Sequence, residues 1–122
     1  MTQAKCKAWW DEENKIGRIK IEGNPDEKMA NELFDKVDEI NSKMSGKTSW
    51  LVDPGDNRPS SRLRKVIAEK FYSNPGIEKQ AVLTTSTVIK VIMQFVMKAS
   101  GRKNVRAFAN EEEALKWLKR GE

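Results

Sequence analysis

Side chains able to do chemistry gather in one segment that follows a short apolar run. Carboxylates in such a segment can bind a cation, and a hydroxyl near the start of a helix can accept a phosphate group. The neighbouring Pro54 and Gly55 predict that the segment is a loop. Its polar and charged members are Asp53, Asp56, Asn57, Arg58, Ser60 and Ser61.

A metal site is the first chemical interpretation of this loop. Asp53 ends a predicted strand with Asp56 nearby, which is similar to the phospho-acceptor site of receiver domains. Magnesium needs several oxygen ligands brought together from different segments. Such a site would need acids after an earlier strand and a lysine after the last one, but the first strand ends in tryptophans and the last strand ends in Phe108 and Ala109. We therefore expect these acids to bind loop amides, and we expect no metal or cofactor.

The two serines have two interpretations. Ser60 or Ser61 could cap the following helix by accepting a hydrogen bond from a free amide, which is worth about 1 kcal/mol. A phosphate on either hydroxyl would instead meet the positive end of the helix dipole and the cations Arg58, Arg62 and Arg64. Modification would then reorganise the loop or repel an acidic partner.

The absence of histidine limits catalysis further. Histidine is the side chain that most often serves as general base, proton shuttle or zinc ligand near neutral pH. Classical catalytic triads and zinc sites are therefore excluded, and the single cysteine, Cys6, offers at most one thiolate. We predict that the protein is not an enzyme and that Cys6 is an ordinary strand residue.

The composition describes a mixed-charge chain of the size of one domain. Its 122 residues suffice for one core, so we expect a single domain over 1–122. The net charge is +5, but the basic residues are spread among glutamates, which favours a solvated surface over nucleic-acid binding. No apolar run approaches the roughly 20 residues of a membrane span, and no signal segment begins the chain, so we expect a cytoplasmic protein.

A second polar cluster consists of hydroxyl side chains. Thr84, Thr85 and Ser86 follow a predicted strand and precede a predicted helix. Open α/β sheets bind ligands at the carboxyl ends of their strands, and a helix N-terminus favours anions. Capping is the simpler interpretation, because no glycine-rich phosphate loop accompanies the cluster.

The segment 86–99 is more apolar than a surface helix needs to be. Its few polar side chains form one narrow stripe on a helical projection, and the apolar arc is about twice the usual ~100°. One explanation is that neighbouring helices cover the surplus through Phe34 and Trp117. The other is a ligand cavity, a dimer surface or a membrane-contacting face. The candidate residues for that role are Ile89, Met93, Val96 and Met97.

Periodic patterns predict the elements that position these residues. Two alternating runs joined by an acidic turn predict a hairpin, and helical spacing bounded by caps and turn formers predicts the helices. Strands then alternate with helices, so we expect an α/β fold of order ββαβαβαβα with a mixed, mainly parallel sheet. The predicted strands are Lys5–Trp10, Lys15–Glu22, Thr48–Val52, Gln80–Thr84 and Asn104–Phe108. The predicted helices run from an Asn24 cap to about Met44, over Ser60–Tyr72, over 86–99, and from an Asn110 cap through Ala114, Trp117 and Leu118.

Several segments between Trp50 and Lys119 together form a familiar pattern. They are the strand Trp50-Leu51-Val52-Asp53, the helix start at Pro59-Ser60-Ser61, the strand 80–84, the apolar helix through Val91 and Ile92, and the strand 104–108 leading into 111–115. This pattern resembles the STAS superfamily of anti-sigma-factor-antagonist-like domains, in particular its SpoIIAA-like branch of small stand-alone proteins.

The resemblance implies a function as well as a fold. In the family's best-known switch proteins, phosphorylation of a serine at the matching helix start ends binding to a partner kinase. Ser60 and Ser61 stand at that place, although the chain has Arg58-Pro59-Ser60-Ser61-Arg62-Leu63 where the usual pattern is Asp-Ser-Ser-Gly-Leu-Gly. The SpoIIAA-like branch is also similar to lipid-binding folds, which adds apolar ligands to the candidates.

Two functions are therefore carried forward. The first is a non-catalytic regulatory module that binds a protein partner through the loop 53–61, with Ser60 or Ser61 as a phosphoswitch. The alternative is a small apolar-ligand or lipid-binding protein that uses the apolar face of helix 86–99. In both cases we expect a monomer or homodimer that binds no nucleic acid and does not span a membrane.

Overall fold

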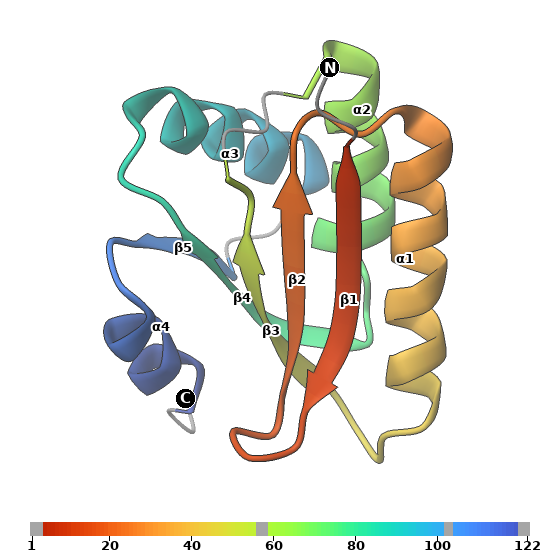
Figure 1. The fold of residues 1–122 in the computed structure, drawn as a ribbon, viewed down its shortest axis with the longest axis vertical. Coiled ribbons are helices and arrows are strands. Elements are labelled where there is room, and N and C mark those ends of the chain that lie inside the picture. Colours follow the sequence, from red (N-terminus) through yellow and green to blue (C-terminus); the bar gives the residue numbers. More distant parts are fainter. Residues whose placement is uncertain (1–3, 56–58, 102–103, 120–122) are drawn as a thin grey trace.

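A five-stranded sheet forms the centre of the molecule (Figure 1). The computed structural model describes residues 4–55, 59–101 and 104–119. The strands lie in the order β1-β2-β3-β4-β5, with β1 antiparallel to β2 and the other neighbours parallel, which confirms the predicted α/β fold and element order. The elements are β1 (Lys5–Asp11), β2 (Ile16–Glu22), α1 (Glu27–Ser42), β3 (Thr48–Asp53), α2 (Ser61–Ile67), the π-helix η1 (Ala68–Tyr72), β4 (Ile77–Leu83), α3 (Thr87–Ser100), β5 (Val105–Phe108) and α4 (Glu111–Leu118).

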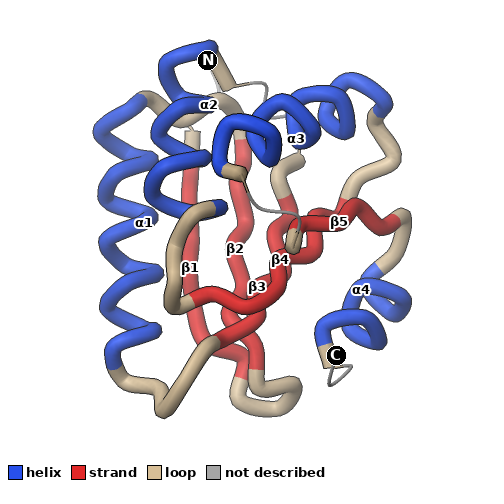
Figure 2. Tube along the Cα trace, turned by 180° about the vertical axis from the view of Figure 1, so that it is seen from behind, coloured by secondary structure: helices blue, strands red, loops and turns tan. Residues whose placement is uncertain are grey.

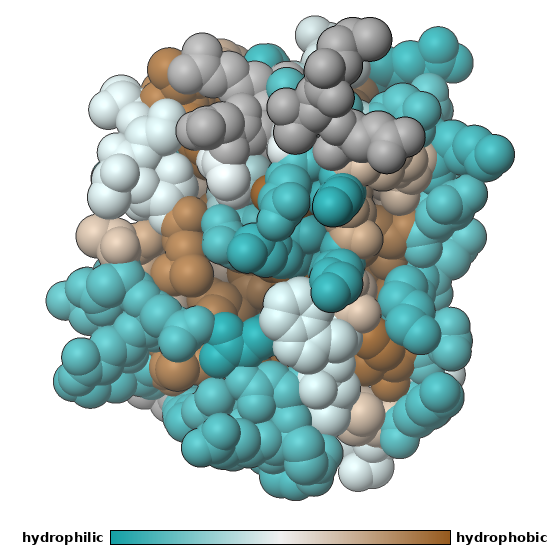
Figure 3. Space-filling view, viewed as in Figure 1, coloured by the Kyte–Doolittle hydropathy of each residue, from teal (hydrophilic) through white to brown (hydrophobic). Residues whose placement is uncertain are grey.

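The helices cover the two faces of the sheet unequally. The helices α1, α2, η1 and α3 lie on one face, which is turned towards the reader in Figure 2 and is here called the front face. The helix α4 packs on the opposite face (Figure 1). The front core is the larger, and the smaller core joins α4 to the sheet through Leu51, Ala81 and Leu118. Where the opposite face is not covered by α4, hydrophilic side chains interrupt the apolar ones (Figure 3).

Aromatic side chains organise the front core. Trp50 is fully buried, and its ring meets that of Phe71 edge-on at 6.4 Å. Phe34 of α1 stacks on Phe71 at 5.4 Å. Gly17 leaves room for the Trp50 ring, because a Cβ there would lie 2.3 Å from it. Each such ring buries a large apolar area between sheet and helices.

Capping side chains set the helix ends. Asp26 Oδ1 accepts a hydrogen bond from Met29 N at 2.8 Å, so the predicted Asn24 cap was wrong by two residues. The first helix ends at Ser42 rather than near Met44. Gly101, with φ of +75°, ends α3 as expected, since a left-handed residue costs glycine little.

The predicted helix Ser60–Tyr72 changes character along its length. It begins as the α-helix α2 and continues as the π-helix η1. The wider turn places the adjacent Phe71 and Tyr72 both in the interior, where each is at most 5% exposed. π-helical turns occur often at functional sites.

The helix α3 is not covered by Trp117, although one explanation of its surplus apolar surface predicted that it would be. α4 lies on the other face of the sheet and α3 packs beside η1 and α2, so Trp117 does not cover α3. Val88, Val91 and Phe95 therefore remain exposed, Phe95 by 62%. Within the described residues, no helix has the length and apolar character needed to cross a membrane.

Candidate functional site

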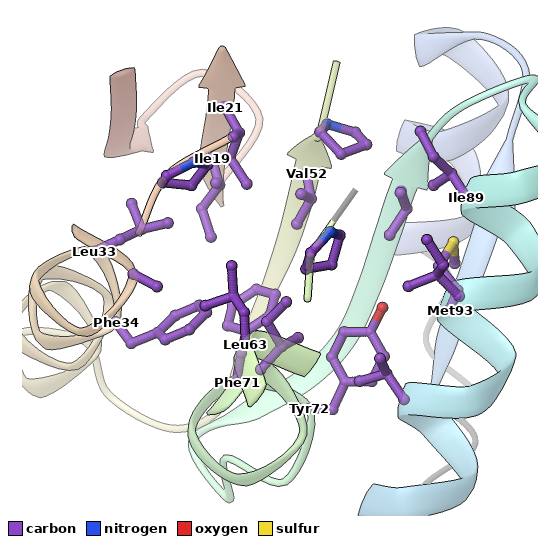
Figure 4. Close-up of a pocket in the computed structure, with 18 residues that line it drawn as sticks. Ile19, Ile21, Leu33, Phe34, Val52, Leu63, Phe71, Tyr72, Ile89 and Met93 are labelled. Carbon is purple, nitrogen blue, oxygen red and sulfur yellow. The ribbon is translucent and has the colours of Figure 1, made fainter. Parts of the chain in front are cut away.

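An apolar pocket, the front pocket, lies between the sheet and the helices of the front face (Figure 4). It has a volume of about 90 Å³ and lies near the carboxyl ends of the central parallel strands. That edge is where open α/β sheets usually bind ligands. The pocket is lined by Ile19 and Ile21 of β2, Val52 of β3, Val82 of β4, Ala30, Leu33 and Phe34 of α1, Leu63 and Ile67 of α2, Phe71 and Tyr72 of η1, Ile89, Ile92, Met93 and Val96 of α3, and the loop residues Pro25, Pro54 and Pro59.

Among the described residues that line the pocket, Tyr72 is the one with a polar side-chain group. Its ring comes from η1, and its hydroxyl points into the pocket (Figure 4). Burial raises the pKa of the phenol well above its usual value, so the hydroxyl stays neutral and able to donate a hydrogen bond.

A polar cleft of about 240 Å³ lies next to the front pocket. It is formed where the N-termini of α1 and α2 come together, and it includes Asp26, Glu27, Ser60 and Arg62. Pro25, Pro59 and Leu63 line both cavities, so these three side chains form the wall between them.

Two arginines tie the start of α2 to its surroundings. Arg62 Nε lies 3.1 Å from Glu27 Oε2, which joins α2 to α1 across the polar cleft. Arg64 Nε donates a hydrogen bond to the carbonyl of Pro59 at 3.0 Å. Of the three arginines predicted to meet a phosphate on Ser60 or Ser61, Arg62 and Arg64 are thus engaged in other contacts, and Arg58 lies outside the described residues.

The structure places only part of the predicted switch loop. Asp53 Oδ1 accepts a hydrogen bond from Gly55 N at 3.2 Å, as expected of an acid that binds a loop amide. Ser60 caps α2 by accepting a hydrogen bond from Leu63 N at 3.2 Å, and Ser61 is exposed at the first helical position. Asp56, Asn57 and Arg58 lie outside the described residues.

The hydroxyl cluster before α3 makes local contacts. Thr84 Oγ1 accepts a hydrogen bond from Ser86 N at 3.0 Å, and Ser86 Oγ accepts one from Ile89 N at 3.3 Å. Thr85 is exposed. This geometry matches the capping interpretation, and anion binding at Thr84, Thr85 and Ser86 stays a prediction.

The predicted ligand or dimer residues of α3 belong to the interior. Ile89, Met93 and Val96 are buried and line the front pocket, and Met97 is partly buried against the same core. The sequence therefore predicted the helix correctly but not which of its apolar side chains are exposed. The Phe71-Tyr72 pair at the end of an amphipathic run was the available signal for the pocket, and the sequence reasoning assigned Tyr72 no role.

Metal-binding side chains do not converge in the described part of the chain. Among its residues, no group of three or more histidine, cysteine, aspartate or glutamate side chains could hold a metal ion. Cys6 of β1 is half-buried near α1, where burial and then the nearby Asp26 raise the pKa of its thiol. A raised pKa lowers the thiolate fraction and hence the reactivity of Cys6.

Comparison with known proteins identifies the fold. The family model of SpoIIAA-like proteins matches residues 16–119. An uncharacterised protein of the DUF3478 family with a SpoIIAA-like fold, from Shewanella loihica PV-4, has a TM-score of 0.69 at 10% identity, over 97% of this chain and 98% of that chain. An anti-sigma factor antagonist from Mycobacterium paratuberculosis has a TM-score of 0.61 at 10% identity, over 97% of this chain and 96% of that chain. The comparison with curated proteins gives no match.

Proposed function

We propose that this chain, which belongs to the SpoIIAA-like family, is a non-catalytic regulatory module of STAS type that binds a protein partner through the loop 53–61 and the start of α2. The observation that carries the proposal is the exposed start of α2, where Ser60 and Ser61 stand beside the polar cleft. A structure described as an anti-sigma factor antagonist shares the fold, which supports a regulatory role.

Phosphorylation of Ser61 would act on the contact between α1 and α2. The side chains of Arg62 and Glu27 are 83% and 44% exposed, and an exposed ion pair contributes little to stability. A phosphate carries close to two negative charges and three acceptor oxygens, so it would compete with Glu27 for Arg62. Release of Glu27 would change the rim of the polar cleft, which is the surface offered to the partner.

Site-specific photo-crosslinking in cells tests the partner surface. A photo-reactive amino acid at Ser61 should yield one dominant crosslinked protein, and the same amino acid at Glu39, exposed further along α1, should not. Mass spectrometry then identifies the protein and reports whether the peptide with Ser60 and Ser61 carries phosphate. Equal crosslinking from both positions would contradict the proposed surface, and strong binding by Ser61→Glu would contradict the switch.

A second function, binding of a small apolar molecule, is favoured by the front pocket. A core without a cavity beside Met93 would argue against this function. Met93 instead lines the front pocket. Extraction of the purified protein with organic solvent, followed by mass spectrometry, detects a bound molecule. Met93→Trp should fill the cavity and abolish retention, and Phe95→Trp, on the exposed side of the same helix, should not. Equal retention by the two variants would contradict binding in the front pocket.

A further inference from the structure

The Tyr72 hydroxyl is a polar group that the described part of the fold leaves without a hydrogen-bond partner. Tyr72 is 5% exposed, and no hydrogen bond to its hydroxyl is formed within 4–55, 59–101 and 104–119. The hydroxyl is not one of the fully buried side-chain atoms that lack a partner, so it reaches space that another molecule can enter. A donor that stays unpaired costs free energy, and most such groups have a partner. The hydroxyl points into the front pocket, so a molecule bound there is placed to accept its hydrogen bond (Figure 4).

Water is a poor candidate for that partner. A buried water molecule usually makes two to four hydrogen bonds, and apolar cavities stay dry. Apart from Tyr72, every described side chain that lines the front pocket is apolar. Within residues 4–55, 59–101 and 104–119, a water molecule there would have the Tyr72 hydroxyl as its only side-chain partner.

The same lining limits the charge of a ligand. Among the described residues that line the front pocket there is no lysine, arginine, aspartate or glutamate. A carboxylate or ammonium group inside the front pocket would therefore be desolvated without a counter-ion, which is strongly unfavourable. A neutral carbonyl, ether or hydroxyl oxygen can accept the Tyr72 hydrogen bond without that penalty.

The volume limits the size of a ligand. An apolar cavity of about 150 Å³ accommodates benzene, and the front pocket has about 90 Å³. Met93, whose flexible side chain lies in the wall, can adapt the space by a small amount. Benzene has six non-hydrogen atoms, so a ligand of the smaller front pocket has at most about six.

From these observations we infer that the front pocket binds a small neutral molecule with an apolar body and one hydrogen-bond acceptor, and that the Tyr72 hydroxyl donates to this acceptor. The inference rests on the second function proposed above and names the chemical class of its ligand. Tyr72 supplies selectivity, because the other described residues of the lining contribute only apolar contact.

A matched set of probes tests this inference in the full chain. Cyclopentanone has the acceptor, cyclopentane lacks it, and butanoate carries a charge. Titration of each probe is followed by NMR of the methyl groups of Met93 and Ile89, which line the front pocket. Cyclopentanone should shift both methyl signals and should bind about fivefold more weakly to Tyr72→Phe, the effect of one ordinary hydrogen bond. Cyclopentane should bind equally to both proteins, and butanoate should leave the signals unchanged.

The other outcomes separate this inference from the function on which it rests. Equal affinity of wild type and Tyr72→Phe for cyclopentanone would overturn the role of Tyr72, while binding of cyclopentane would leave the apolar-ligand function standing. Butanoate binding as tightly as cyclopentanone would overturn the neutral class. If no probe moves the Met93 and Ile89 signals, both the inference and the second function fail.

The stability of the ligand-free variant is an independent measurement. Without a partner for the hydroxyl, Tyr72→Phe should unfold at the same urea concentration as the wild type or at a higher one. A lower midpoint would mean that the hydroxyl is already bonded inside the protein, which would overturn the inference.

Discussion

The side-chain amide of Gln80 donates a hydrogen bond to the main-chain carbonyl of Phe71 at 3.0 Å, and this contact joins the centre of the sheet to the π-helix η1. Gln80 is fully buried, and its Oε1 has no hydrogen-bond partner in the described part of the chain. The same carbonyl also accepts Asn74 N at 3.1 Å. The amide of Gln80 thus fixes the turn that brings Phe71 and Tyr72 into the front pocket.

Two substitutions at Gln80 should separate the effect of its side-chain volume on stability from the effect of its polar amide. Gln80→Leu keeps most of the volume and leaves the Phe71 carbonyl bonded to Asn74 N, so we expect a loss of about 1 kcal/mol in the free energy of unfolding. Gln80→Glu places a buried carboxylate beside that carbonyl without a cation, and we expect a loss of about 3 kcal/mol or more at pH 7. Urea unfolding of the two variants measures both, and equal losses would contradict the buried contact.

The packing of Gly17 against Trp50 gives a steric prediction. A methyl group at position 17 would lie 2.3 Å from the indole, which is itself fully buried and cannot move aside freely. Gly17→Ala should therefore lower the free energy of unfolding by about 3 kcal/mol, at the upper end of overpacking effects. The double variant Gly17→Ala, Trp50→Phe should recover part of that loss, because the smaller ring relieves the clash. Additive losses in a double-mutant cycle would mean that the two residues do not meet as described.

The two serines at the start of α2 should differ in their effect on stability. Ser60 accepts the hydrogen bond from Leu63 N, so Ser60→Ala should cost about 1 kcal/mol. Ser61 is exposed, and Ser61→Ala should stay within about 0.5 kcal/mol of the wild type. Thermal unfolding of both variants checks the prediction. A larger loss of stability for Ser61→Ala than for Ser60→Ala would show that Ser61, and not Ser60, caps the helix.

Local sequence patterns were sufficient to predict the order of the elements. Strand alternation and helical spacing depend on nearby residues, and so does the Asn110 cap, whose Oδ1 accepts Glu113 N at 2.9 Å. The cap of α1 was misplaced because Asn24 and Asp26 both precede the helix and both are favoured capping residues.

The pocket and the placement of α3 depend on contacts that are distant in sequence. Periodicity shows that a helix has an apolar face but not which side of the sheet the helix covers, so Trp117 was expected beside α3 although α4 lies on the other face. The front pocket brings together Ile19, Leu63 and Met93 from three separate elements. The π-helical turn at Tyr72 has no repeating pattern by which the sequence alone would reveal it.

The hairpin turn contains a carboxylate whose protonation should affect stability at low pH. Hydrogen bonds from the Asn14 side chain and from Arg18 hold the pKa of Asp11 at about 2. Arg18 also lies 2.5 Å from Glu111 of α4, so Asp11 orients a cation that links the hairpin to the last helix. Asp11→Asn removes the ion pair and should lower the free energy of unfolding by about 1 kcal/mol at pH 7.

The pH dependence of that loss follows from the direction of the shift. The pKa of Asp11 in the folded protein lies below the unfolded value of about 3.9, so its stabilising contribution is complete above pH 4 to 5 and is lost as the pH falls through about 2. Urea midpoints of wild type and Asp11→Asn should therefore differ from pH 7 to pH 5 and converge near pH 2. Glu13→Gln, exposed on the same turn, controls for the loss of one negative charge. A difference that persists unchanged to pH 2 would show that Asp11 acts through packing and not through its charge.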